Sequence, residues 1–219
     1  MGKIEGKNAY SFAKRATKKD FTNMIESDIL PLLNLDKRPL VVDFGTGSGN
    51  IIPFFVEKVY KFTAIEPSEE MVKMMRKEYG GYKNLNIILA SADNTPLEST
   101  SYDIAITKFT LHHIKDAQKF FSEVKRILKH KGQFVIIDMM FNSHIFIKII
   151  EPFWKIKKAL ELGLHELNCV YRSNSYIEEL IKINGFEIKH KKKIKGKRTY
   201  RDKHYPAYIY ILENSPHLP

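Results

Sequence analysis

An acidic residue and three closely spaced glycines stand near residue 45. Asp43 ends an apolar run, and Gly45, Gly47 and Gly49 follow it at every second position. Glycine loses more backbone entropy on folding than any other residue, so this density indicates positive φ angles or a close approach of the backbone to a ligand. The apolar residues 40–44 predict a buried strand, and the residues after Gly49 begin a helix. A strand, a glycine turn and a helix in this order direct backbone N–H groups toward an anion or a polar ligand.

Further ionisable side chains follow the later apolar runs. Glu66 and Asp138 each end such a run, His112 and His113 follow another, and His144 lies just beyond Asp138. If the runs are parallel strands, these side chains meet at the carboxyl edge of one sheet, where open α/β folds bind ligands. His112, His113 and Asp138 are therefore candidate catalytic bases. A reaction requires such a base when the reacting group of its substrate arrives protonated, as an ammonium or a hydroxyl does. The paired histidines could instead begin a helix, with one ring packed and the other in water.

The elements that would position these residues alternate along the chain. Amphipathic helical stretches separate the apolar runs, and this alternation predicts a mostly parallel α/β sheet with helices on both faces. One helix is predicted to begin near Ser68 and end at Gly80, and a later one to close at Gly132. The seven predicted strands are 40–44, 62–66, 85–89, 103–107, 134–138, 186–193 and 208–212.

Composition and charge exclude several classes of protein. The 219 residues contain one cysteine, Cys169, so we expect no internal disulfide and no thiol cluster for zinc or iron–sulfur, and we predict no metal site. We find no signal peptide and no apolar stretch of transmembrane length, which predicts a cytoplasmic protein. The net charge is +11, with the excess concentrated in residues 188–205. This basic stretch is either a phosphate-binding patch or a solvated hairpin.

The glycine turn belongs to a recognisable series of motifs. A dinucleotide-binding fingerprint would place its third glycine at position 50, where this chain has Asn50. With its acid and three glycines between positions 43 and 49, the chain resembles the first motif of class I S-adenosylmethionine-dependent methyltransferases. Residues 65–67 (IEP), 90–114 and 127–138 resemble the family's later motifs in the right order. The resemblance covers residues 40–138 well and the last two predicted strands loosely.

The resemblance implies a Rossmann-like fold with an antiparallel last strand, a helical cap insertion and bound S-adenosyl-L-methionine, with S-adenosyl-L-homocysteine as the product. It places Glu66 on the two ribose hydroxyls, both of which one carboxylate can accept, and Asp43 near the methionine ammonium. Glu66 and Asp93 could instead be surface acids, and Lys108 could face the substrate or the solvent. The implied cofactor-binding residues are Asp43, Gly45, Thr46, Gly47, Gly49, Glu66, Pro67, Ser91, Ala92, Asp93 and Lys108.

By the same resemblance, residues 1–219 form a single methyltransferase domain. Its expected parts are an N-terminal helical lid (1–38), a cofactor-binding core (39–138), a helical substrate-cap insertion (139–172) and a C-terminal helix with a strand pair (173–219). The C-terminal helix is predicted to open with a capping box from Ser175 to Glu178. The candidate substrate-binding residues are Tyr10, His112, His144, Phe153, Trp154 and Tyr171.

The predicted reaction is methyl transfer to an N or O atom of a small or medium organic molecule by direct in-line displacement. Residues 107–110 (TKFT) lack the Pro-Pro-aromatic pattern of base amino-methylation, and Cys169 has no preceding proline, which disfavours covalent attack on cytosine. The alternatives are an RNA methyltransferase that uses the basic strip Lys189–Lys203, and a lipid or quinone methyltransferase at the membrane surface. A regulatory module that binds the cofactor without turnover is a further alternative. We expect a small-molecule methyl acceptor as partner, with nucleic acid less favoured, and a monomer or homodimer.

Overall fold

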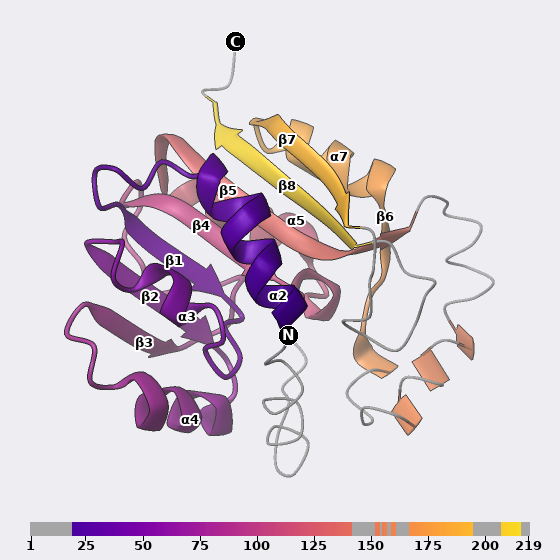
Figure 1. Cartoon of the computed structure of the whole chain (residues 1–219). Helices are drawn as coiled ribbons and strands as arrows, with labels where there is room; N and C mark the ends of the chain where they lie inside the picture. Colours follow the sequence, from indigo (N-terminus) through magenta and orange to yellow (C-terminus); the bar gives the residue numbers. More distant parts are fainter. Residues whose placement is uncertain are drawn as a thin grey trace.

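The computed structural model describes residues 19–141, 152–153, 155–156, 159–160, 167–194 and 207–215. Its centre is a single sheet with the order β3-β2-β1-β4-β5-β8-β7, and β6 pairs with β5 off this path (Figure 1). Among the pairings of the described strands, only the two made by β8, with β5 and with β7, are antiparallel. The predicted α/β class, the mostly parallel sheet and the antiparallel last strand are confirmed.

The strands match the apolar runs of the sequence. Even β1 and β3, with five residues each, are long enough to cross the buried centre of the sheet. The strand bounds are β1 Leu40–Phe44, β2 Lys61–Glu66, β3 Leu85–Leu89, β4 Tyr102–Lys108, β5 Leu128–Phe141, β6 Arg172–Ser173, β7 Phe186–Ile194 and β8 Ala207–Asn214.

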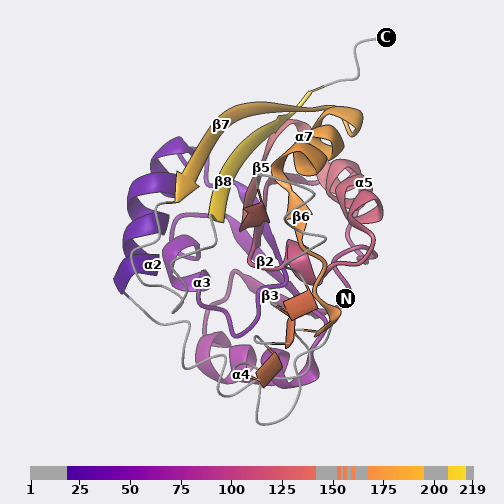
Figure 2. The same cartoon turned by 90° about the vertical axis from the view of Figure 1, so that its right-hand side faces the viewer.

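Helices cover both faces of the sheet, as predicted. Figure 2 shows α5 and α7 on one side of the sheet and α2 and α3 on the other. The helices are α2 Lys19–Met24, continued by the turns η1 Ile25–Ile29 and η2 Leu30–Leu32, then α3 Ile52–Phe55, α4 Glu69–Tyr79, η3 Leu111–His113, α5 Ala117–Ile127 and α7 Asn174–Ile183. Within the described residues, none of these helices has the length and apolar character needed to cross a membrane.

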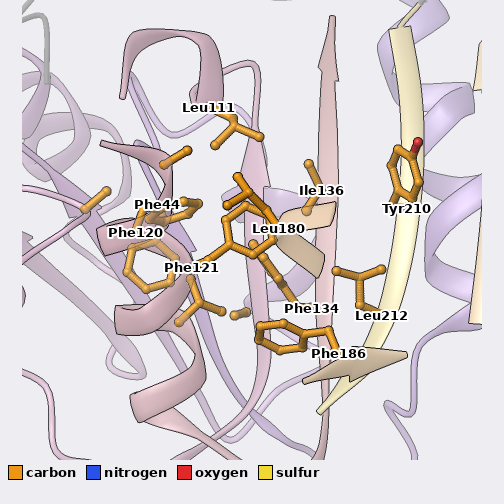
Figure 3. Packing of buried hydrophobic residues seen from close by; sticks show 14 of the residues in the cluster. Phe44, Leu111, Phe120, Phe121, Phe134, Ile136, Leu180, Phe186, Tyr210 and Leu212 are labelled. Atoms are coloured by element: carbon orange, nitrogen blue, oxygen red, sulfur yellow. The ribbon is translucent and has the colours of Figure 1, made fainter. Parts of the chain in front are cut away.

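A buried hydrophobic cluster rich in aromatic rings packs α5, and α7 through Leu180, against their face of the sheet (Figure 3). Phe121 of α5 meets Phe134 of β5 edge to face at 5.6 Å between ring centroids, and Phe186 of β7 lies 5.6 Å from Phe134. Edge-to-face aromatic pairs add about 0.5–1.5 kcal/mol to the stabilisation from burial. On the opposite face, Ile29 and Phe55 pack in a second buried cluster. The two clusters hold the sheet rigid, so the loops at its ends start from fixed positions.

Three local predictions are wrong. Helix α5 ends at Ile127 rather than at Gly132, because Leu128 already has extended backbone angles and pairs with Tyr102 as the first residue of β5. The sequence also predicts an apolar helical face that includes Ile25, Ile29 and Leu32. Leu32 is instead 42% exposed, since the helix tightens into a 3₁₀ turn there and Leu33 is buried in its place.

The third error concerns the start of α7. Its N-cap is Ser173, whose Oγ accepts a hydrogen bond from the backbone N–H of Tyr176 at 3.2 Å, and not Ser175. Ser175 bonds to the Ser173 hydroxyl, and Glu178 is held by Lys191 of the neighbouring strand. The predicted capping box therefore does not form. The domain boundaries remain predictions, because residues 1–18 and more than half of residues 139–172 fall outside the described ranges.

Candidate functional site

The glycine turn joins β1 to α3 at the carboxyl edge of the sheet. The backbone N–H groups of Gly45 and Thr46 both donate to the carbonyl of Ile65 at the end of β2, at 2.8 and 3.1 Å. Gly45 has φ +70°, and a Cβ there would lie 2.2 Å from Thr110 Cγ2. Thr110 in turn donates from Oγ1 to the carbonyl of Gly45 at 3.1 Å. The turn is therefore held between β2 and the segment after β4, and only glycine fits at position 45.

Glu66 lies at the end of β2 and faces the same turn. Its Oε2 accepts from the backbone N–H of Gly47 at 2.9 Å, and its Oε1 accepts from the backbone N–H of Ser68 at 3.0 Å. Pro67 between them is buried. Burial raises the pKa of Glu66, although the two N–H donors oppose the shift. The carboxylate is thus fixed in orientation at the rim of the glycine turn, in reach of a ligand seated there.

Asp43, which precedes the glycine turn, interacts electrostatically with Lys108 at the end of β4. Asp43 is 1% exposed, and burial raises its pKa to about 7, with Lys108 and the Thr46 hydroxyl opposing the rise. Burial lowers the pKa of Lys108, and Asp43 opposes that shift. Lys108 and Asp43 each favour the charged form of the other. With a pKa of about 7, Asp43 can therefore lose or gain its proton near neutral pH when a ligand changes its neighbouring charges.

Two buried polar atoms beside the glycine turn lack partners. Among the described residues, Asp43 Oδ1 and Ser48 Oγ have no hydrogen bond. A Cβ added at Gly47, which has φ +63°, would meet nothing within 4 Å. Buried polar groups are nearly always satisfied, so these atoms and this open space fit a polar ligand that brings its own donors and acceptors. The amino-acid part of S-adenosylmethionine, an ammonium with a carboxylate, has that chemistry.

The segment after β3 supplies the other side of the predicted cofactor site. Ala92 is fully buried, while Ser91 and Asp93 are half-buried. The Ser91 hydroxyl donates to Asp93 Oδ1, and Ser91 also forms an isolated bridge with Asn94. One carboxylate oxygen of Asp93 is thus occupied within the loop. The arrangement is compatible with the predicted contact to an adenine through the hydroxyl or the second carboxylate oxygen.

A buried histidine–carboxylate pair follows β4. His112 Nδ1 lies 2.6 Å from Asp138 Oδ1, and the backbone N–H of His112 donates to Asp138 Oδ2 at 3.2 Å. Burial alone would raise the pKa of Asp138, yet the pKa lies below its ordinary value because His112 and the N–H of Met139 stabilise the carboxylate. With Asp138 as acceptor, Nδ1 of His112 carries the hydrogen and Nε2 can accept a proton. The two residues were predicted separately as candidate bases, and the structure brings them together.

The second histidine, His113, points to a different partner. Its Nδ1 lies 3.4 Å from the thiol sulfur of Cys169, and the rings of His113 and His112 are 4.2 Å apart. One ligand atom from each of the three residues lies within 4.8 Å of the others. Imidazole and thiol donors of this kind suit Zn²⁺, and the sequence gives no sign of their convergence because Cys169 is distant along the chain.

Aromatic rings cover the histidine–carboxylate pair. Tyr171 is buried and stacks on His112 with centroids 5.8 Å apart and an interplanar angle of 8°. Phe141 at the end of β5 meets Tyr171 edge to face at 5.7 Å. Tyr171 was predicted as a substrate-binding residue, and it forms an apolar wall beside the candidate base.

Sequence reasoning missed the residue that shapes this corner. The buried Arg172 guanidinium donates to four backbone carbonyls, at distances from 2.6 to 3.1 Å: those of Leu111, Ile114, Lys115 and Val170. It therefore holds the η3 turn, and with it His112 and His113, against β6. A single arginine ahead of a serine-rich helix start carries no signal for that role, since its carbonyl partners are defined only by the fold.

Of the remaining predicted substrate-binding residues, the structure describes only Phe153. Its side chain is 76% exposed among the described residues. Tyr10, His144 and Trp154 lie outside the described residues. Their predicted roles toward the substrate stay predictions.

The chain is similar to known methyltransferases over the part that contains these residues. A family model described as a methyltransferase domain matches residues 42–136, which run from β1 to β5 and include the glycine turn, Glu66 and both histidines. The YcgJ protein of Bacillus subtilis, an uncharacterized methyltransferase, is 29% identical over 100 residues, 45% of this chain and 40% of YcgJ. Its solved structure superposes with a TM-score of 0.66 at 18% identity and covers 83% of this chain and 93% of that one.

Two further similarities extend over more of the chain. The ubiquinone/menaquinone biosynthesis C-methyltransferase UbiE of Campylobacter jejuni is 29% identical over 177 residues, 71% of this chain and 74% of UbiE. A methyltransferase solved in complex with the Haloferax volcanii Trm112 methyltransferase activator shares the fold. That superposition has a TM-score of 0.72 and 15% identity, over 98% of this chain and 100% of that one.

Proposed function

Because the chain belongs to the class I S-adenosylmethionine-dependent methyltransferases, we propose that its acceptor is a small or medium-sized ring-bearing molecule whose hydroxyl must lose a proton. The observation that carries this proposal is the buried pair of His112 and Asp138 beneath Tyr171. A phenolate or enolate is nucleophilic at oxygen and at the adjacent ring carbon. The same base therefore serves O-methylation and C-methylation, and the name of the relative UbiE favours a quinone-type ring and the carbon.

We assign the methyl donor to the carboxyl edge of β1 and β2. When bound, S-adenosylmethionine supplies a methyl group already activated on a sulfonium, so the chain needs no covalent nucleophile. Glu66 would accept from the two ribose hydroxyls after releasing the N–H of Gly47. Asp43 and Ser48, whose buried oxygens lack partners in the described structure, would meet the methionine end. Ser91 and Asp93 would border the adenine.

The chain's own part in the reaction is to hold the acceptor and take its proton. His112 Nε2 would accept the hydroxyl proton while Nδ1–H remains on Asp138. Asp138 stabilises the imidazolium that forms and fixes the ring's orientation, which is the role of the acid in other histidine-based sites. Tyr171 and Phe141 would exclude water and pack against the acceptor's ring. Thr110 links this corner to the glycine turn, so donor and acceptor sites share one rigid support.

The test begins with calorimetric titration of the purified protein with S-adenosylmethionine and S-adenosylhomocysteine. A panel of hydroxylated rings, including hydroquinones, is then screened for release of S-adenosylhomocysteine. Mass spectrometry of the product identifies the methylated atom. We expect His112→Gln to lower turnover by about a hundredfold or more, the usual contribution of a positioned base, with unchanged affinity for the donor.

The matched control is His130→Gln, because His130 is exposed at the other edge of the sheet. It should leave turnover unchanged. A folded wild-type protein that binds neither nucleotide would refute the assignment of the donor site. Full turnover in His112→Gln would refute the base, as would a best acceptor that has no ionisable proton.

A further inference from the structure

A hollow lies at the amino edge of the sheet, opposite the candidate active site. It has a volume of about 600 Å³ and is bordered by the beginnings of β1, β4 and β5. In Figure 1 the indigo connection from α2 to β1 marks this end, whereas the glycine turn follows the arrowhead of β1. A five-residue strand separates the two edges by about 15 Å. The hollow is therefore distinct from the cofactor site.

Fixed hydrogen bonds build the walls of this hollow. Asp103 accepts from the backbone N–H of Leu40 at 2.8 Å, which joins β4 to the start of β1. Gln133 accepts from the N–H of Asn34 at 2.9 Å and donates to the carbonyl of Leu32 at 3.0 Å. The connection before β1 is thereby tied to β5. The size of the hollow suits a nucleotide-sized group, since small-molecule sites usually measure about 300–1,000 Å³.

The carboxylates of the hollow are already neutralised. Asp103 pairs with Lys129 at 2.8 Å, and Glu213 pairs with Lys189 at 3.2 Å. Three other cations border the hollow, Lys37, Arg38 and Lys131, and all three are exposed. None of these three has a carboxylate partner among the described residues. The hollow therefore carries uncompensated positive charge from two separate loops.

An exposed aromatic ring stands at the same place. Tyr60 borders the hollow, and its side chain is 70% exposed. Its backbone N–H donates to the carbonyls of Arg38 and Pro39, and the Arg38 guanidinium donates to the carbonyl of Val59 at 3.3 Å. The Arg38 guanidinium is thus held against the backbone of the residue that precedes Tyr60. Cations beside an exposed ring are the combination that binds single-stranded nucleic acid, with phosphates on the cations and a base stacked on the ring.

Two of the three cations adopt backbone angles that disfavour them. Arg38 has φ +48° and Lys131 has φ +60°, in the left-handed region that favours glycine. Such conformations cost free energy, and they cluster at ligand clamps and active sites. A glycine at either place would relieve the strain but remove the charge.

We propose that this hollow is a second binding site, which holds a single-stranded RNA segment through its phosphates on Lys37, Arg38 and Lys131 and through a base stacked on Tyr60. The proposal does not depend on the identity of the methyl acceptor. An acidic protein segment would meet the same charges, but it would make no use of the exposed ring.

The test is fluorescence anisotropy with a labelled single-stranded RNA of mixed sequence at about 50 and 200 mM salt. Three phosphate contacts on a single strand predict a salt slope of about −2, which is roughly a twentyfold loss of affinity over that range. In the triple variant Lys37→Ala/Arg38→Ala/Lys131→Ala we expect the slope to become shallower by about two. Tyr60→Ala should lower the affinity by about tenfold with an unchanged salt slope, since stacking is not electrostatic.

The matched control removes the same charge elsewhere. Lys73→Ala/Lys77→Ala/Lys182→Ala neutralises three exposed lysines on α4 and α7 and should retain the wild-type slope. Both triple variants should melt and bind S-adenosylmethionine as the wild type does, so this test is independent of the proposed function. Equal losses in the two triple variants would overturn the site, as would absence of RNA binding at the lower salt. Competition by polyglutamate as effective as that by unlabelled RNA would show a site for acidic segments instead.

Discussion

At the carboxyl edge of the sheet the acidic side chains are buried, whereas at the amino edge three cations stand exposed around a hollow. Asp43, Glu66 and Asp138 are each at most 6% exposed, and a hydrogen bond or a neighbouring charge fixes each of them. Lys37 and Lys131, at the other end of the same strands, are exposed and have no carboxylate partner in the described structure.

This difference decides how each edge responds to change. A buried group cannot exchange its lost partner for water, so a single substitution there carries a large cost. Exposed cations are hydrated and screened, so each contributes little and their effects add. We therefore expect large, specific effects at the carboxyl edge and small, salt-dependent ones at the amino edge.

The largest effect should come from Gly45→Ala. A Cβ there would lie 2.2 Å from Thr110 Cγ2, and the backbone has φ +70°. Backbone strain of about 1–2 kcal/mol and overpacking of about 1–3 kcal/mol together predict a loss of roughly 3 kcal/mol in the free energy of unfolding. Urea titration measures this loss.

Gly47→Ala is the matched control, because Gly47 has φ +63° and a Cβ there meets no atom within 4 Å. It should cost only the backbone strain, about 1–2 kcal/mol. Equal losses in the two variants would show that Thr110 yields easily and that the two halves of the site are not rigidly joined.

Glu66→Gln should have the next largest effect, on the binding of S-adenosylmethionine. Hydrogen bonds to a charged acceptor are worth about 1.5–3 kcal/mol, so loss of the charge predicts an affinity about tenfold to a hundredfold weaker. Glu69→Gln removes an exposed acid three residues away and should bind as the wild type does. Calorimetric titration measures both, and equal affinities for the two variants would remove Glu66 from the cofactor site.

Much of this edge could be predicted from the sequence, because it depends on strand ends. Periodic apolar runs located β1 and β3 at their observed bounds, and β2, β4, β7 and β8 to within two residues. The run for β5 covered only the middle of that strand, and the two-residue β6 was not predicted. Asp43 is the penultimate residue of β1 and Glu66 the last of β2, so their meeting followed from the sheet topology. The hydrophobic pattern was sufficient here because a one-residue shift would turn each buried face outward.

The contacts that complete the site could not be predicted in this way. Thr110 and Gly45 are 65 residues apart, and the carbonyls that Arg172 binds are up to 61 residues away. Side chains that satisfy backbone groups across loops leave no periodic signal. The amino-edge hollow is similar, since its residues lie where strands begin and apolar periodicity has ended. The prediction of the N-cap of α7 failed because either of two nearby serines, Ser173 or Ser175, could cap the helix. Tertiary contacts choose between them.

The third effect is a pH dependence that originates at Asp43. Its pKa is raised from 3.8 to about 7 by burial, so the folded protein keeps this proton between about pH 4 and 7 while the unfolded chain releases it. Stability from this group is therefore lost as pH rises through that window, by up to about 1.4 kcal/mol per pH unit. A ligand ammonium needs the carboxylate, so affinity for S-adenosylmethionine should fall up to about tenfold per unit below pH 7.

Asp43→Asn tests the predicted pH dependence of the stability and that of the affinity for S-adenosylmethionine in one variant. It should be more stable than the wild type at pH 8, because no buried charge must form, and its weaker binding should not vary with pH in this window. Asp36→Asn, at an exposed position, should retain the wild-type profile. Thermal melts and calorimetric titrations at pH 6, 7 and 8 measure these quantities. A pH-independent affinity in the wild type would exclude Asp43 as the partner of the ammonium.

The smallest effect, and the one that separates the two edges most directly, should come from Lys131→Gly. Lys131 has φ +60° at the exposed hollow, so glycine should raise the free energy of unfolding by about 1 kcal/mol. Thr100 has φ +53°, is exposed and does not border the hollow, so Thr100→Gly should give a similar gain. Only Lys131→Gly should also weaken RNA binding, with a salt slope shallower by about 0.7. A gain in stability without any loss of binding would mean that the strained lysine contributes nothing at the amino edge, and the contrast between the two edges would then reduce to burial alone.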